Sequence, residues 1–139
     1  MKKSKYKVAA ISNAYKSLCS AKVTRMKEGE KFAVVRIMKA LKPIATEYQG
    51  FIDDVSKKFM PENFEPIASK MPNLNSLTKE EREIFNRYEA SVNKCVVEEG
   101  QREVSVEFAP ISEESLQRLV EGSDLFLGEI MNFYDIIVQ

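Results

Sequence analysis

Residues Glu30–Phe59, EKFAVVRIMKALKPIATEYQGFIDDVSKKF, carry the most regular pattern in the chain. Apolar side chains recur there at alternating intervals of four and three residues, at Val34, Met38, Leu41, Ala45, Tyr48, Ile52, Val55 and Phe59. This spacing predicts a helix with a heptad seam. A second row repeats every seven residues beside the seam, at Ile37, Ile44 and Phe51. The apolar face is therefore wider than a two-stranded seam, and we expect it to need more than one neighbour.

Pro43 falls inside this pattern. Proline removes one backbone hydrogen bond from a helix and clashes with the preceding turn, at a cost of about 3 kcal/mol or more. The heptad register nevertheless continues unshifted across Pro43, which favours one kinked helix over two separate helices. Lys57 and Lys58 suit a helix C-terminus, and Pro61 prevents further helix.

Capping signals place the other helices. Ser12 is expected to cap a first helix whose apolar row extends as far as Met26, with Gly29 as its stop. Thr78-Lys79-Glu80-Glu81 is a capping box, and predicts a helix that ends at Gly100. The apolar row of this helix is Phe85, Tyr88, Val92 and Cys95. A short helix at 61–71 and a loop at 72–76 would join the two long helices as an antiparallel hairpin.

After Gly100 the period of the pattern changes to two residues. Val104, Val106 and Phe108 alternate with polar residues, which predicts a half-buried strand over 103–108. The strand has three possible partners: the lysine-rich segment 3–8, the tail 136–138, or the same strand of a second subunit. Pairing with the first would place lysines opposite Glu103 and Glu107.

The C-terminal segment predicts two short helices. Ser112 caps the first, which Gly122 stops, and Ser123 or Asp124 caps the second. The outline resembles a helix-turn-helix, but the second helix has no Lys or Arg and would repel phosphates. We therefore expect its apolar residues to pack within a helical hairpin, namely Leu125, Phe126, Leu127, Ile130, Met131, Phe133 and Tyr134.

These elements predict a mainly α fold with a small β element (α+β). The fold would be a long antiparallel helical hairpin with short C-terminal helices and a two-stranded ribbon. The 139 residues suit a single domain over 1–139.

The amino-acid composition excludes several kinds of catalytic, metal-binding and pH-sensing site. The chain has no His, which excludes a Ser-His or Cys-His relay, a His-bearing zinc site and a histidine pH switch built from this chain alone. Cys19 and Cys95 are too far apart in sequence for CxxC metal spacing, and both are expected to pack in the core of a protein in a reducing compartment. No apolar run approaches the length of a membrane span, so we expect a cytoplasmic protein without a membrane partner.

The net charge of zero conceals two oppositely charged halves. Lys and Arg number 21, as do Asp and Glu, but residues 1–60 hold 14 basic and 5 acidic residues, whereas 61–139 hold 7 and 16. Adjacent carboxylates such as Glu98-Glu99 diverge on a helix and do not form an acid/base pair. No catalytic, metal or cofactor site is predicted, and no cofactor is expected.

We therefore expect a non-enzymatic interaction or assembly protein, acting by self-association or by docking to a larger complex. The wide apolar face and the separated charge favour a protein partner or a homo-oligomer. Its candidate interaction residues are Lys3, Lys5, Lys7, Glu98, Glu99, Glu103 and Glu107. The alternative is a nucleic-acid-binding accessory protein that uses the basic segment, including Lys16, Lys22, Arg25 and Lys27.

The layout also resembles a group of known proteins. The patches that carry the resemblance are Ile11-Ser12-Asn13-Ala14, Arg25-Met26, Lys31-Phe32, Arg102-Glu103-Val104, Ile111-Ser112-Glu113-Glu114 and Leu127-Gly128-Glu129-Ile130-Met131. Their order is similar to that of small uncharacterised proteins encoded in bacteriophage and prophage genomes. The resemblance implies a phage accessory or assembly protein, and no catalytic residues.

Overall fold

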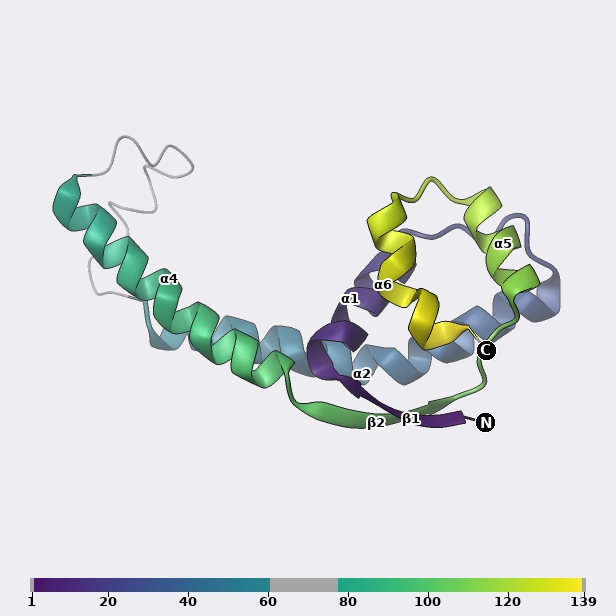
Figure 1. The fold of residues 1–139 in the computed structure, drawn as a ribbon, viewed down its shortest axis with the longest axis horizontal. Coiled ribbons are helices and arrows are strands. Elements are labelled where there is room, and N and C mark those ends of the chain that lie inside the picture. Colours follow the sequence, from purple (N-terminus) through teal and green to yellow (C-terminus); the bar gives the residue numbers. More distant parts are fainter. Residues whose placement is uncertain (1, 61–77, 139) are drawn as a thin grey trace. The chain divides into compact units, whose positions relative to one another are not determined.

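The computed structural model describes residues 2–60 and 78–138 (Figure 1). Their elements, in chain order, are β1 (Lys2–Lys7), α1 (Val8–Cys19), α2 (Glu28–Lys58), α4 (Lys79–Gly100), β2 (Glu103–Phe108), α5 (Glu113–Gly122) and α6 (Leu127–Ile137). The predicted mainly α fold with a small β element is confirmed. The short helix and loop expected at 61–76 lie outside the described residues. No helix of the described ranges is both long and apolar enough to cross a membrane.

The contacts divide the chain into two compact units. The first unit comprises Met1–Tyr48 and Gly100–Gln139, and the second comprises Gln49–Glu99. The first unit therefore joins the N-terminal and C-terminal parts of the chain, whereas the second contains the end of α2 and nearly all of α4.

The predicted long helix forms and continues through Pro43. Its inner face follows the heptad seam, with Val34, Leu41, Ala45, Tyr48 and Val55 all buried. Leu41 and Ala45 flank the proline and are both buried, so the apolar register is the same on either side of it. This shared register explains why one helix forms rather than two.

In the second unit, α4 begins at the predicted capping box. The Thr78 amide donates to Glu81 Oε1 at 2.9 Å, and the Glu81 amide donates to Thr78 Oγ1 at 3.1 Å. Tyr88 joins this helix to the end of α2, because its hydroxyl donates to the Ser56 carbonyl at 3.0 Å. The predicted apolar row is half-buried, which identifies the inner face of α4.

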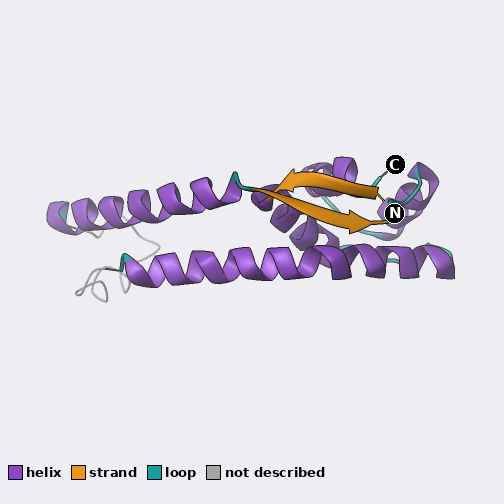
Figure 2. Cartoon of the chain, turned by 90° about the horizontal axis from the view of Figure 1, so that it is seen from below, coloured by secondary structure: helices purple, strands orange, loops and turns teal. Residues whose placement is uncertain are grey.

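The two strands form an antiparallel ribbon within the first unit (Figure 2). The register places Lys3 opposite Glu107 and Lys7 opposite Glu103. The predicted pairing with the lysine-rich segment is therefore confirmed. Within the described residues, the tail forms an isolated bridge between Ile111 and Val138, just beyond the end of β2.

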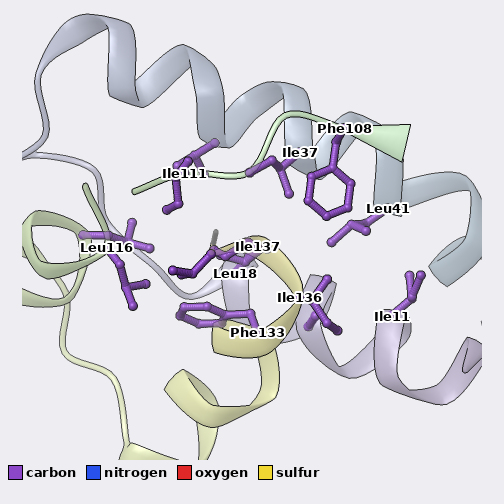
Figure 3. Packing of buried hydrophobic residues seen from close by; sticks show 14 of the residues in the cluster. Ile11, Leu18, Ile37, Leu41, Phe108, Ile111, Leu116, Phe133, Ile136 and Ile137 are labelled. Atoms are coloured by element: carbon purple, nitrogen blue, oxygen red, sulfur yellow. The ribbon is translucent and has the colours of Figure 1, made fainter. Parts of the chain in front are cut away.

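The core of the first unit is built from both ends of the chain (Figure 3). Ile37 and Leu41 of α2 are fully buried, as are Leu119 of α5 and Phe133 and Ile137 of α6. The inner face of the ribbon contributes Val106 and Phe108. The wide face of α2 thus receives several neighbours from its own chain.

Two predictions at α1 are wrong. The helix begins at Val8 rather than after Ser12, because Val8 and Ile11 start the buried row. Ser12 lies inside the helix, 1% exposed, and its hydroxyl has no hydrogen-bond partner among residues 2–60 and 78–138. Cys19 is exposed rather than packed in the core, because it is the last residue of the helix and the buried row ends at Leu18.

Three other boundaries also differ from the sequence expectation. Met26 is buried, but it lies in the loop between α1 and α2, because α1 ends at Cys19. Gly29 lies in the first turn of α2 and stops no helix. Helix α6 starts at Leu127 rather than near Ser123, because the Ser123 hydroxyl bonds the Lys22 backbone and the Leu119 carbonyl instead of capping α6.

Two glycines in helices give a matched test of the packing. A Cβ at Gly100 would lie 2.7 Å from Tyr48 Oη and 3.0 Å from Ala9 Cβ, whereas a Cβ at Gly50 would have nothing within 4 Å. Gly100→Ala should destabilise the protein by about 1–3 kcal/mol through overpacking. Gly50→Ala should stabilise it by up to about 1 kcal/mol, because alanine favours a helix interior. Urea denaturation of both variants measures the difference, and equal stabilities would contradict the packing at Gly100.

Candidate interaction surface

The outer side of α6 exposes a row of large apolar side chains. Leu127, Met131 and Tyr134 follow i, i+4, i+7 spacing, and their exposed fractions are 73%, 67% and 37%. Phe126, which immediately precedes the helix, is 81% exposed. We call these four residues the α6 patch.

The patch arises because α6 is apolar on two sides. Phe133, Ile136 and Ile137 form its buried side. An apolar face this wide is usually buried, but within residues 2–60 and 78–138 only the part of it that carries Phe133, Ile136 and Ile137 is covered. Clustered exposed apolar residues of this kind mark interaction sites more often than single ones do.

Polar contacts hold α6 and its patch in place. Asn132 Nδ2 donates to Ser17 Oγ of α1 at 3.0 Å, and α6 packs along α1 (Figure 1). The Tyr134 hydroxyl donates to the carboxylate of Glu113 on α5, and this hydrogen bond raises the pKa of Tyr134. The Phe126 amide donates to Glu129 Oε1 at 3.2 Å, which fixes the start of the helix. A partner would therefore meet a patch that is already ordered.

A groove borders the patch and shares Met131 with it. Its volume is about 360 Å³, and its lining residues are Tyr6, Ala10, Asn13, Met131, Asn132, Asp135 and Ile136. The groove thus extends the apolar surface from α6 toward α1 and β1, with one carboxylate in its wall.

The charged residues of the segment that carries the patch are all negative. Residues 119–139 contain Glu121, Asp124, Glu129 and Asp135, and no Lys or Arg. A surface with an apolar centre and acidic surroundings favours a partner with an apolar centre and basic surroundings.

A second polar cluster joins the start of α2 to α5. The Glu30 carboxylate accepts from Arg118 Nε at 2.7 Å and Nη2 at 2.5 Å, from Ser115 Oγ at 2.5 Å and from the Lys27 amide at 2.8 Å. These hydrogen bonds, led by that of Arg118, lower the pKa of Glu30 to about 2. Both carboxylate oxygens already have donors, so the cluster is suited to hold α5 in place rather than to bind a substrate.

The ribbon brings together four of the predicted interaction residues. Lys3 pairs with Glu107 and Lys7 with Glu103, while Lys5 lies opposite Ser105. Opposite charges in directly facing positions stabilise a ribbon by about 0.2–1 kcal/mol per pair. The register therefore places lysines of the basic half opposite glutamates of the acidic half within one chain.

The other predicted residues lie elsewhere. Glu98 and Glu99 are in the last turn of α4, in the second unit, with Glu98 exposed and Glu99 half-buried. The cations of the nucleic-acid alternative have exposed side chains, and they lie on α1 and in the loop that follows it: Lys16, Lys22, Arg25 and Lys27. Binding of nucleic acid by these four residues stays a prediction. No group of three or more Cys, Asp and Glu within residues 2–60 and 78–138 is arranged to hold a metal ion.

The α6 patch was not predicted from the sequence. Packing inside a helical hairpin was expected for Phe126, Leu127, Met131 and Tyr134, and that expectation is wrong, because all four are exposed. The signal that could have identified the patch is the distribution of apolar residues over more than one side of α6.

The Glu30 cluster predicts a specific pH dependence of stability. Because folding lowers the pKa of Glu30, its ionised form stabilises the protein above the ordinary carboxyl pKa of about 4.3, and this contribution is lost as the pH falls toward 2. Glu30→Gln should therefore lower the melting temperature at pH 7. The difference in melting temperature between this variant and the wild type, called the gap below, should narrow toward pH 3. Glu28→Gln, which removes an exposed carboxylate from the same turn, is the control. A gap that is unchanged between pH 7 and pH 3 would contradict the role of the ion pair.

Comparisons with known proteins assign no function to this surface. No protein-family model matches the chain, and searches of curated proteins and of solved structures found no match. The function is therefore inferred from the residues of the chain itself.

Proposed function

We propose that the protein is a non-enzymatic interaction or assembly protein that docks through the α6 patch. The observation that carries the proposal is the exposure of Phe126, Leu127, Met131 and Tyr134 on a helix whose other side is fully packed. Aromatic residues and methionine are enriched at the centres of protein interfaces, where water is excluded. A role in phage assembly, which the layout resemblance implies, is one setting for such docking.

The wide apolar face and the separated charges suggested assembly in the sequence, but both are largely occupied by contacts within one chain. The inner face of α2 is covered in the first unit, where Val34, Ile37 and Leu41 are at most 4% exposed. Lysines of β1 face glutamates of β2. Neither the wide apolar face nor the ribbon charges therefore requires a second molecule, and the proposal depends on α6 instead.

Site-specific cross-linking tests the proposal. A benzoylphenylalanine at position 131, in cells that naturally produce the chain, should give adducts of defined mass after irradiation, because the patch is in contact with a protein partner. The same residue at position 117, which is an exposed position on α5, is the control. Leu127→Glu should abolish the adducts, because a charge in the patch opposes apolar docking.

Stability provides the second readout of this experiment. Leu127→Glu should change the free energy of unfolding by no more than about 0.5 kcal/mol, because the residue is 73% exposed. Adducts that are equally abundant at positions 117 and 131, or absent from both, would contradict the proposal.

A further inference from the structure

We infer that the α6 patch binds the outer face of α2 in a second copy of the chain, so that copies associate head to tail. The inference rests on the proposed function, because it names the occupant of the same patch. The outer face of α2 is defined here as Phe32, Val35, Arg36, Lys39 and Lys42.

The outer face of α2 is a second exposed surface with an apolar centre. Phe32 is 56% exposed and Val35 is 46% exposed, and the side chains of Arg36, Lys39 and Lys42 are exposed beside them. The spacing from Phe32 through Val35 and Arg36 to Lys39 places these residues on one stripe of the helix. The opposite stripe, with Ile37 and Leu41, is fully buried.

One copy cannot bring these two surfaces together. Figure 3 shows Ile37 and Leu41 of α2 in the same core as Phe133 and Ile137 of α6. The outer face of α2 and the α6 patch are on the sides of their helices that face away from that core. Contact between these two surfaces therefore requires two copies of the chain.

Charge favours the pairing of an α6 patch with an outer face of α2 over the pairing of two α6 patches or of two α2 faces. Three cations, Arg36, Lys39 and Lys42, and one carboxylate, Glu28, lie on the same stripe of α2 as its apolar centre, which leaves this face positive overall. Asp124 and Asp135 lie near the apolar centre of α6 in sequence. Two α6 patches would bring carboxylates together, and two α2 faces would bring cations together; like charges that meet at an interface oppose binding. Only the α2-to-α6 arrangement matches apolar residues and opposite charges at once.

The two surfaces are also similar in length. The exposed row of α6 extends from Leu127 to Tyr134, and the outer face of α2 extends from Phe32 to Lys42. At 1.5 Å per residue they are about 12 Å and about 16 Å long, so the α6 row fits within the outer face of α2. Because the paired surfaces differ, the contact is heterologous and adds further copies until a ring closes.

A complementation experiment tests the inference with the full chain. Leu127→Glu/Met131→Glu disables the α6 patch, and Phe32→Glu/Val35→Glu disables the outer face of α2. Sedimentation velocity should show wild-type oligomers larger than dimers that grow with concentration and shrink at high salt. Each double variant alone should be monomeric. Their equimolar mixture should form a dimer and nothing larger, because each variant keeps one intact partner surface.

The outcomes separate this inference from the proposed function. If the mixture stays monomeric, or if the α2 variant associates like the wild type, head-to-tail binding is wrong. If the wild type is monomeric at every concentration while position 131 still forms cross-links to another protein, head-to-tail binding is again wrong and the proposed function stands. Thermal melts of both variants, with Gln117→Glu as a control, and the milder Phe32→Ala/Val35→Ala variant exclude loss of folding as the cause of monomers.

Discussion

The inner face of α2 in the first unit is the constraint on which the rest of that unit depends. A helix whose apolar row is wider than a single seam cannot be covered by one neighbour. Ile37 and Leu41 are fully buried because elements from both parts of the unit, before and after the second unit in sequence, pack around them. Burying a side chain of this size contributes about 1.5–3 kcal/mol, so this shared core supplies much of the stability.

Patterns with a strong period made most of the fold predictable. The heptad row placed α2, the alternation at 103–108 placed β2, and the capping box at Thr78 placed the start of α4. Signals from single residues, such as a capping serine, gave wrong helix boundaries where tertiary contacts decide where a helix begins. Ser12 has the chemistry of a cap, yet β1 leads directly into α1 at Val8, so the serine is buried inside the helix.

The exposed α6 patch was harder to predict than the fold. The apolar residues of α6 cover a wide arc of the helix, and Gly128, Asn132 and Asp135 lie on the remaining side, so the sequence does not indicate which part of the apolar arc becomes buried. Contacts between residues distant in sequence decide which side is buried. Asn132 forms a hydrogen bond with Ser17, and Tyr134 forms one with Glu113. Met131 is left outside, although its residue type suits a core equally well.

The ribbon has a consequence for the order in which the chain acquires its structure during synthesis. Strand β1 is made before the residues that pair with it, from Glu103 to Phe108, which follow about a hundred residues later. Until then the ribbon cannot form, and the inner face of α2 lacks the ribbon and α6. The long helix therefore has exposed apolar surface at this stage, and the first unit completes its core only after α6 has been made.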